Sequence, residues 1–571
     1  MSAEQLITQH INTWTSALQT RSTAGRGNNG KIDLYGIKKL RELILELAVR
    51  GKLVPQDPND EPASELLKRI AAEKAELVKQ GKIKKQRPLP EISEDEKPFE
   101  LPVGWEWVRI SEIGHDWGQK TPDLQFTYID VGSINKELGI ISEPEIVQAE
   151  NAPSRARKIV KEGTVVYSTV RPYLLNIATV SEKFDPEPIA STAFAIIHPF
   201  KGIFSNYIYY YLRSSTFINY VEGCQTGIAY PAINDKQFFS GLIAIPPSNE
   251  QNLIINKVGE FMALCDQLEQ QSLTSLEAQT QLVDTLLATL TNSQNAEELA
   301  ENWARISQNF DTLFTTEASI DALKQTILQL AVMGKLVPQD PNDEPASELL
   351  KRIQQEKAQL VKEGKIKKQK PLPPVSDEER PFDLPEGWEW VRFGSVINIR
   401  AELVKPEKHY NSLQVAPDII EKGTGKVLSK RTVKESGVKG PNSKFYKNQI
   451  VYSKIRPSLS KAFIAEYDGL CSADMYPIDC FINSEYLLKV ILSEVFLIQV
   501  RAAENRIKMP KLNVDSLSNI LIPVPPAKVQ SVISDRINEM HISSDLLKSR
   551  LQSAQQTQLH LADALTDAAL S

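Results

Sequence analysis

Residues 51–70 read GKLVPQDPNDEPASELLKRI, and residues 334–353 repeat the same twenty letters. The match continues without a gap to residues 109 and 392, and 47 of these 59 aligned positions are identical. A repeat of this length determines the architecture before any local motif is considered. Because the offset of 283 residues is close to half of the 571-residue chain, the sequence predicts two tandem halves.

Two shorter matches extend the repeat beyond this segment. The sequence YSTVRP at 167–172 corresponds to YSKIRP at 452–457, and PAINDKQFFSGLIAIPP at 231–247 corresponds to PKLNVDSLSNILIPVPP at 510–526. Between these matches the halves differ in sequence and in loop length. Each half therefore has a near-identical helical arm, a divergent globular domain and a helical tail, which suggests a shared scaffold that carries two different recognition modules.

Apolar residues at helical spacing identify the first helix of each arm. Ile37, Leu40 and Ile44 lie on one face of this helix in the first copy, and Gly51 and Gly334 are its expected C-terminal stops. A second, charged helix follows and is expected to run to residue 81 in the first copy and 364 in the second.

The serines that precede the sequence ELLKRI are the expected N-caps of this second helix. They are Ser64 in the first copy and Ser347 in the second, and a serine hydroxyl can accept a hydrogen bond from the first free amides of a helix. Proline-rich and acid-rich linkers follow both helices.

The globular domains and tails complete a predicted α+β fold class. Short β-branched and aromatic runs such as GTVVYSTV and NQIVYSKI indicate two mixed α/β domains. The long amphipathic tails, whose apolar spacing is partly heptad, are expected to form antiparallel coiled-coil helices. The repeat predicts an internal pseudo-two-fold relation. The expected boundaries are 1–36 for an N-terminal extension, 37–104 for the first arm and linker, 105–247 for the first globular domain, 248–319 for the first long helical spacer, 320–387 for the second arm and linker, 388–526 for the second globular domain, and 527–571 for the second spacer.

The composition excludes several classes of protein. Charged residues make up 24% and hydrophobic residues 41% of the chain, as in ordinary globular proteins. No apolar run reaches the roughly 18 residues that a membrane-spanning helix needs, and the polar N-terminus lacks the features of a secretory signal. We therefore expect a cytoplasmic protein with no membrane association. The four cysteines are scattered, which predicts neither a disulfide framework nor a zinc site.

The motifs of DNA-modifying enzymes are missing from the sequence. An adenine methyltransferase needs a glycine-rich cofactor loop and a D/N-P-P-aromatic tetrapeptide, and neither is present. The segment GTGK at 423–426 lacks the first glycine of a phosphate-binding loop and is followed by Val427 instead of a hydroxyl residue. The six histidines are isolated from one another and from other ligands. We therefore predict no catalytic residue, no metal site and no cofactor in this chain.

Local charge indicates a nucleic-acid site, although the net charge of the whole chain is −6. Residues 422–461 contain eleven basic residues and one acid, Glu435. The second globular domain has 20 basic and 14 acidic residues, a net charge of +6, whereas the first has 12 and 15, a net charge of −3. Clustered lysine and arginine residues are typical of surfaces that bind the DNA backbone.

Thirteen basic residues are candidates for contacts with DNA. Arg171 and Arg456 rank highest because they occupy matching positions after a strand-like run, although a structural arginine is an equally good interpretation. Gln119, Thr121 and the segments 228–234 and 506–513 can supply base contacts, because they are polar, looped and different between the halves. The basic candidates are Lys120, Arg155, Arg157, Lys158 and Arg171 in the first domain, and Lys430, Arg431, Lys444, Lys447, Lys454, Arg456, Arg506 and Lys508 in the second.

Taken together, these features resemble the specificity subunit of type I restriction-modification systems over essentially the whole chain. The resemblance is carried by the duplicated arm at 40–70 and 323–353, the LPxGWEWVR segment at the start of each globular domain, the Arg-Pro pair after a strand, and the LIAIPP and LIPVPP segments before each long helix. Each feature alone is weak, but the combination is specific. The residues before Ile37 and the extended arms depart from a minimal domain-helix-domain-helix plan, and they leave the role of the N-terminal segment open.

The resemblance implies two target recognition domains, each of which reads one half of a split, asymmetric DNA sequence, with the long helices acting as a ruler between them. It implies double-stranded DNA, two copies of a modification methyltransferase subunit and restriction/translocase subunits as partners. S-adenosylmethionine, ATP and Mg²⁺ are then expected on those partner subunits, which carry out adenine methylation, translocation and cleavage.

Two other functions stay open at the level of the sequence. One is a stand-alone DNA methyltransferase or endonuclease, which the missing motifs disfavour and which binding of S-adenosylmethionine would revive. The other is a helical scaffold without a DNA role, whose globular domains bind proteins.

Overall fold

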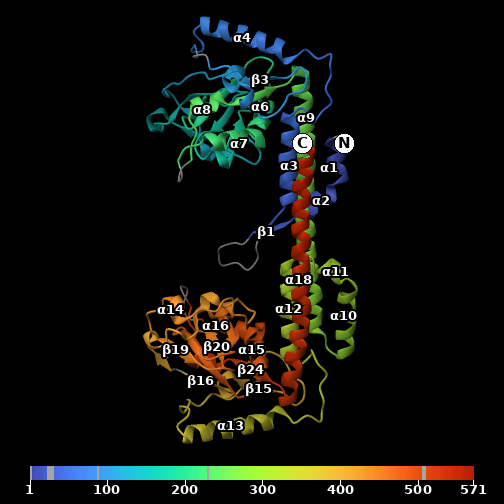
Figure 1. Ribbon diagram of the computed structural model, residues 1–571, viewed down its shortest axis with the longest axis vertical. Helices are drawn as coiled ribbons and strands as arrows, with labels where there is room; N and C mark the ends of the chain where they lie inside the picture. Colours follow the sequence, from blue (N-terminus) through green and yellow to red (C-terminus); the bar gives the residue numbers. More distant parts are fainter. Residues whose placement is uncertain (1–2, 22–30, 86–88, 228–230, 401, 505–509) are drawn as a thin grey trace. The chain divides into compact units, whose positions relative to one another are not determined.

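The computed structural model describes residues 3–21, 31–85, 89–227, 231–400, 402–504 and 510–571. The chain forms two compact units, residues 1–275 with 554–571 and residues 276–553 (Figure 1). Each unit contains one arm and one globular domain. The boundary between the units falls within two long helices, α9 (Ser248–Asn292) and α18 (Ala527–Leu570), and each of these helices contributes to both units.

Each globular domain begins and ends on a two-stranded antiparallel ribbon. In the first domain β3 (Glu106–Arg109) pairs with β14 (Leu242–Ile245), and in the second β15 (Glu389–Arg392) pairs with β24 (Leu521–Val524). These strands are formed by the WEWVR segment and the apolar segment before each Pro-Pro pair. The chain therefore enters and leaves each globular domain at the same place.

Between its two ribbon strands the first globular domain forms two small mixed sheets. Their strand orders are β4-β13-β10-β11-β7-β6 and β8-β5-β12-β9. All four residues of the central strand β10 are buried, as expected for a strand covered on both faces. The elements are α5 (Ile110–Ile113), β4 (Gly114–His115), β5 (Phe126–Ile129), β6 (Ile134–Asn135), β7 (Ile140–Ile141), β8 (Glu145–Val147), β9 (Ala156–Ile159), β10 (Val165–Ser168), β11 (Ile177–Thr179), β12 (Pro188–Ser191), β13 (Phe194–Pro199), α6 (Ser205–Leu212), α7 (Ser215–Cys224) and α8 (Asp235–Ser240).

The second globular domain also forms two sheets between its ribbon strands, one mixed and one entirely antiparallel. Its sheets have the orders β16-β23-β20-β21 and β17-β19-β22-β18. The elements are β16 (Ile397–Ile399), β17 (Leu403–Val404), β18 (Gln414–Val415), α14 (Val433–Ser436), β19 (Asn442–Phe445), β20 (Ile450–Ser453), β21 (Ala462–Ile464), β22 (Gly469–Ser472), β23 (Met475–Cys480), α15 (Ser484–Leu492), α16 (Glu494–Ala503) and α17 (Val514–Asn519).

The two globular domains share a core topology although their sequences diverge. In the first domain β5 and β12 are parallel, and β9 pairs antiparallel with β12. In the second domain β18 and β22 are parallel, and β19 pairs antiparallel with β22. In the first domain the central strand β10 pairs antiparallel with β13 on one side and β11 on the other. In the second domain β20 pairs in the same way with β23 and β21. Tyr167 of β10 and Tyr452 of β20 are both fully buried in matching positions. The halves therefore share this core but differ in their outer strands, because β6 and β7 extend one sheet only in the first domain, and β8 and β17 lie at opposite edges of the other sheet.

The arms contain α3 (Tyr35–Val49) and α4 (Ala63–Lys79) in the first unit, and α12 (Glu317–Val332) and α13 (Ala346–Lys362) in the second. Gly51 and Gly334 follow α3 and α12 with φ values of +67° and +71°. These left-handed conformations end the helices, as predicted from the sequence.

The prediction that Ser64 and Ser347 cap the second helix of each arm is wrong. Helices α4 and α13 begin two residues earlier than this prediction, at Ala63 and Ala346, and their N-cap residues are prolines, whose side chains cannot accept a hydrogen bond. The first amide of α4 donates instead to the carbonyl oxygen of Gly104 (2.8 Å), and that of α13 donates to the carbonyl oxygen of Gly387 (2.8 Å). Main-chain contacts with the start of the globular domain thus replace the expected serine cap.

A buried arginine joins each linker to its globular domain. Arg109, at the end of β3, donates to Glu96 of the linker (Nη1 to Oε2, 2.7 Å) and to the carbonyl oxygen of Ser240 (2.9 Å). Arg392 donates in the same way to Glu379 (2.7 Å) and to the carbonyl oxygen of Asn519 (3.0 Å). These hydrogen bonds lower the pKa of both glutamates. The linkers are therefore anchored identically in the two units.

The first helix of each arm packs against a long helix of its own unit. In the first unit, Arg41 of α3 donates to Glu269 of α9 (2.6 Å). In the second unit, Lys548 of α18 pairs with Asp321 of α12 (3.1 Å), and Gln552 donates to Glu317 (2.9 Å), so α12 and α18 run antiparallel there. Helices α9 and α18 have 45 and 44 residues. The predicted fold class, α+β with two similar domains and long helices, is confirmed.

The N-terminal segment, whose role the sequence left open, occupies a definite place in the repeat. Helices α1 (Ala3–Gln9) and α2 (Ile11–Ser16) contact α3, and the hydroxyl of Ser16 donates to Gln558 of α18 (3.2 Å). In the second unit α10 (Ala296–Gln308) and α11 (Phe310–Leu313) precede α12, and Gln279 of α9 donates to the carbonyl oxygen of Thr312 (2.7 Å). Helices α1 and α2 are thus the counterpart of α10 and α11.

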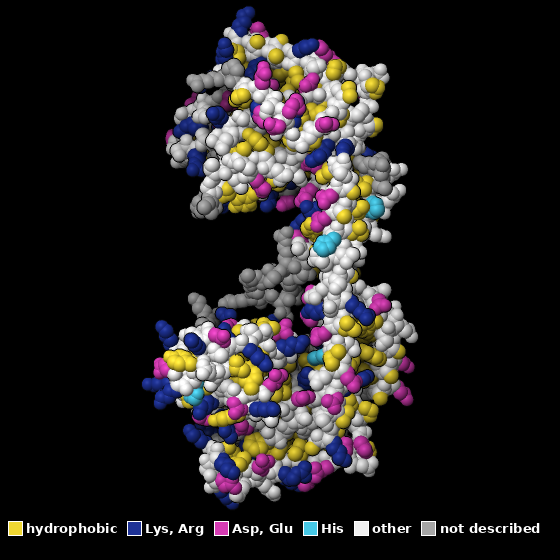
Figure 2. All heavy atoms as spheres, in the orientation of Figure 1, with side chains coloured by type: hydrophobic (Ala, Val, Ile, Leu, Met, Phe, Trp, Pro, Cys, Tyr) yellow, Lys and Arg dark blue, Asp and Glu magenta, His cyan; other side chains and the backbone are white. Residues whose placement is uncertain are grey.

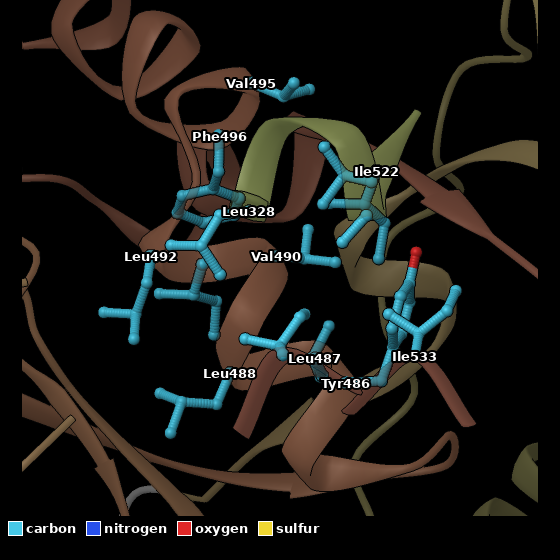
Figure 3. Close-up of a cluster of buried hydrophobic side chains, with 14 of the residues drawn as sticks. Leu328, Tyr486, Leu487, Leu488, Val490, Leu492, Val495, Phe496, Ile522 and Ile533 are labelled. Carbon is cyan, nitrogen blue, oxygen red and sulfur yellow. The ribbon is translucent and has the colours of Figure 1, made fainter. Parts of the chain in front are cut away.

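The core of the second unit joins its arm, its globular domain and its long helix. Figure 3 shows Leu328 of α12, Phe496 of α16 and Ile533 of α18 directed into one buried cluster with side chains of α15 and β24. Within it the hydroxyl of Tyr486 donates to the carbonyl oxygen of Pro523 (3.0 Å), so the buried phenol is satisfied. The globular domain is therefore held on its helical support by a continuous apolar core.

Gly51 offers a test of the contact between arm and globular domain. A Cβ atom at Gly51 would lie 2.5 Å from Cγ of Pro102 and 3.1 Å from Trp105, whereas at Gly81, with φ +71°, it would meet nothing within 4 Å. We expect Gly51→Ala to destabilise the first unit by roughly 2–4 kcal/mol and Gly81→Ala by roughly 1 kcal/mol. Chemical denaturation of the two variants measures both values. Equal effects would show that the close approach to Pro102 is unimportant.

Candidate nucleic-acid interface

One group of predicted residues gathers at the edge strand β9 of the first globular domain. The amide of Lys120 donates to the carbonyl oxygen of Arg157 (2.9 Å), and Gln119 forms a bridge with Lys158, so this segment continues the sheet beyond β9. The side chain of Lys120 pairs with Glu187 (2.5 Å), and this hydrogen bond raises the pKa of Lys120. The structure thus brings together residues that lie 37 positions apart in the sequence.

The members of this group differ in exposure. Arg155 is exposed, and Arg157 is half-buried and donates to the carbonyl oxygen of Ala156 (2.7 Å). The side chain of Lys158 is only 7% exposed and pairs with Asp235 at the start of α8 (3.0 Å). Because Lys158 is enclosed and already neutralised, its position indicates a structural role, and we leave it out of the interface proposed below.

Arg171 and Arg456 occupy identical turns in the two globular domains. Each follows a central strand, adopts a left-handed backbone conformation and precedes a proline that opens a short 3-10 turn, Pro172–Leu174 or Pro457–Leu459. Both residues are exposed. The structure therefore places them equivalently, as their matching sequence positions predicted.

In the second globular domain, two predicted residues are paired with acids. Arg431 makes two hydrogen bonds with Asp418 (2.8 and 2.9 Å), which lower the pKa of that carboxyl group. Lys444, on β19, pairs with Glu402 (2.9 Å) and lowers the pKa of Glu402. Both basic side chains keep about a third of their surface exposed. Contacts with DNA by these two residues would therefore compete with existing ion pairs.

Three other basic residues of this domain are more available. Lys430 is exposed and lies over the ring of Tyr467 (5.4 Å to the centroid), and Lys454 lies over Tyr476 (5.2 Å). Lys447 is exposed. Figure 2 shows lysine and arginine side chains mixed with acidic ones over the visible face of this domain. Arg506 and Lys508 lie outside the described residues.

Two further residues lie near the arginine turns: Lys511, which belongs to the predicted segment 506–513, and Tyr173, which was not among the predicted residues. Lys511 bridges to Ile455 in the main chain and pairs with Asp474 (3.2 Å), which places a further cation beside Arg456. Tyr173, directly after the Arg-Pro pair of the first domain, is 51% exposed. The repeat contained the signal for Tyr173, because this residue directly follows the Arg-Pro pair that matches between the halves.

Two other kinds of site are absent from the described residues. Within these residues, no cluster of three or more histidine, cysteine, aspartate or glutamate side chains could hold a metal ion. Each helix of the described chain is too short or too polar to cross a membrane.

Comparison with known families identifies the two globular domains. A family model described as "Type I restriction modification DNA specificity domain" matches residues 102–278 and 385–556. Each match covers one globular domain and part of the long helix that follows it. The chain belongs to the type I restriction-modification specificity family. It is therefore a specificity subunit, whose role is recognition of a DNA target rather than catalysis.

Similar proteins support this membership over the full length. The chain is 50% identical to the type I restriction enzyme EcoAI specificity subunit and 49% identical to the EcoEI specificity subunit, both from Escherichia coli, and each alignment covers all of both chains. A solved structure described as "Structural basis underlying complex assembly and conformational transition of the type I R-M system" has a TM-score of 0.53. It covers 83% of this chain and 99% of its own at 20% identity, which supports the fold. Membership decides among the three functions that the sequence left open.

The contrast between Lys158 and Arg155 gives a testable prediction for a specificity subunit. Lys158→Gln removes the enclosed ammonium group that pairs with Asp235 and should lower the stability of the first unit by roughly 1–3 kcal/mol. Arg155→Gln changes an exposed side chain on the same strand edge and should alter stability by about 0.5 kcal/mol or less. Thermal unfolding of both variants tests this difference, and an unchanged stability of Lys158→Gln would return Lys158 to the list of surface candidates.

Proposed function

We propose that the chain recognises a bipartite, asymmetric DNA target, and that each globular domain reads one half of it. The observation that carries this proposal is that the two domains share one core topology but have different surfaces. Two domains with the same core can bind the DNA backbone in the same orientation, and their different surfaces can contact different bases. The target is therefore expected to consist of two dissimilar half-sites.

The proposed DNA contacts are the basic residues that remain at least partly exposed. The higher net charge of the second globular domain, +6 against −3 in the first, supports a larger contribution of this domain to attraction by the DNA backbone. Lys158 is omitted because it is buried, and Arg506 and Lys508 remain predictions from the sequence. The proposed set is Lys120, Arg155, Arg157, Arg171, Lys430, Arg431, Lys444, Lys447, Lys454 and Arg456.

Specificity subunits of these systems work with DNA and with other subunits. We infer that two copies of a modification subunit bind this chain, because the two arms are nearly identical and are anchored by the same arginine and glutamate contacts. Adenine methylation with S-adenosylmethionine would take place on those subunits, and translocation and cleavage with ATP and Mg²⁺ on restriction subunits. We place the complex in the cytoplasm.

The long helices have a proposed role as a spacer between the half-sites. Both α9 and α18 contribute residues to both units, so each of these helices connects the unit of one globular domain to the unit of the other. We propose that these lengths, rather than the reading surfaces, set the number of unread base pairs between the half-sites.

Mapping of modified adenines tests the proposed function. The chain is expressed together with its modification subunit in a bacterial host that lacks adenine methylation. We expect one split, asymmetric motif that is methylated only when both chains are present. A host that expresses the modification subunit alone is the control. A continuous motif, or methylation that does not depend on this chain, would contradict the proposal.

A further inference from the structure

Arginine occupies one of the left-handed backbone positions that the two globular domains share. Arg171 has φ 50° and ψ 57°, and Arg456 has φ 44° and ψ 53°. L-residues adopt this left-handed region at an energetic cost that glycine does not have. A position that needed only this backbone shape would be filled best by glycine or asparagine.

A second left-handed position in the same turn provides an internal comparison. It is occupied by Leu175 (φ 52°) in the first domain and by Ser460 (φ 48°) in the second. The turn therefore requires the backbone shape at both positions but accepts different side chains at one of them. Retention of arginine at the other position, in otherwise divergent domains, indicates that the guanidinium group itself is needed.

The turn that carries each arginine is held by the same hydrogen bonds. The buried hydroxyl of Ser168 donates to the carbonyl oxygen of Val170 (2.9 Å), and Ser453 makes the same bond to Ile455 (2.9 Å). This bond orients the peptide group directly before the arginine. The amide of Arg171 donates to the carbonyl oxygen of Pro231 (2.8 Å), as the amide of Arg456 does to Pro510 (2.9 Å).

The exposure of these arginines separates them from the structural arginines of the fold. The side chains of Arg109 and Arg392 are 8% and 10% exposed and pair with a glutamate of the linker. Arg171 and Arg456 are exposed at the surface of their turns. A guanidinium group on a rigid, exposed turn is well suited to a phosphate group, which it can bind through two parallel hydrogen bonds.

We propose that Arg171 and Arg456 are equivalent contacts to the phosphodiester backbone of DNA, one in each globular domain, and that they position the domain without reading sequence. The inference rests on the proposed function of the two domains. Its basis is that an element identical in both readers cannot distinguish two different half-sites. Backbone contacts position a protein on DNA, whereas base contacts specify the sequence.

The surroundings of the two arginines differ in charge. In the second domain, Lys454 and Lys511 flank Arg456, whereas Thr169 and Ala232 occupy the matching places around Arg171. Because Lys511 is paired with Asp474 (3.2 Å), Lys454 is the neighbouring cation that can reinforce the contact made by Arg456, and Thr169 in the matching place cannot do so for Arg171. Loss of Arg171 should therefore remove a larger share of the attraction between the first domain and the DNA backbone than loss of Arg456 removes for the second domain.

Substitution by glycine tests the proposal, because it removes the side chain with its guanidinium group while it favours the left-handed backbone conformation. Arg171→Gly and Arg456→Gly are made in the full chain and assembled with the modification subunits. A second pair, Arg171→Gln and Arg456→Gln, keeps a side chain at each position. Arg536→Gln on α18, an exposed arginine 54% accessible in its side chain, is the control for the loss of one charge.

We expect each glycine variant to bind target DNA roughly tenfold more weakly. The slope of log binding constant against log salt concentration should decrease by about 1, as expected for one lost phosphate contact. The loss should be equal for the correct target and for targets with single base changes, and the melting temperature should stay the same or rise. The glutamine variants should show the same loss of binding, and the control should bind like the unaltered complex.

Three results would overturn the inference. Unchanged affinity and salt dependence would exclude a phosphate contact. Altered discrimination at one base pair would assign the arginines to base reading. A lower melting temperature of the glycine variants would assign them to the fold. Failure of the unaltered complex to bind any sequence specifically is a different outcome, since it would refute the proposed function as a whole.

Discussion

The pairing of the first and last strands of each globular domain is the constraint on which the rest of the structure depends. β3 pairs with β14, and β15 with β24, so both ends of each domain are fixed at one place on the helical support. The arginine at the end of the first strand, Arg109 or Arg392, joins the same point to the linker. Because this closure involves only short terminal segments, the residues between them can vary without altering how the domain is attached.

This closure explains how one chain can carry two readers. The sheets of the two domains share their central strand pairs, and these strands bury equivalent residues such as Tyr167 and Tyr452. Changes are concentrated at sheet edges and turns, where a substitution alters the surface without disturbing the core. The arms, in contrast, are nearly identical, which is consistent with a partner that is the same on both sides.

The repeat, the helical arms and the fold class could be predicted from the sequence, because they depend on identity and on apolar spacing. The starts of the second helix of each arm could not, since the amides of Ala63 and Ala346 bond to carbonyl groups of residues that are distant in the sequence. Basic composition located the candidate interface only coarsely. Local sequence does not reveal that Lys158 meets Asp235, or that Arg431 meets Asp418, because these pairs form only when the sheets assemble.

The central claim is that each globular domain is an independent reader on a common support. The most direct measurement replaces residues 388–526 by a second copy of residues 105–247 and maps methylated adenines in the assembled complex. Our account predicts that both halves of the target become the half-site of the first domain. Retention of the original second half-site would contradict it, because sequence reading would then reside outside the exchanged domain.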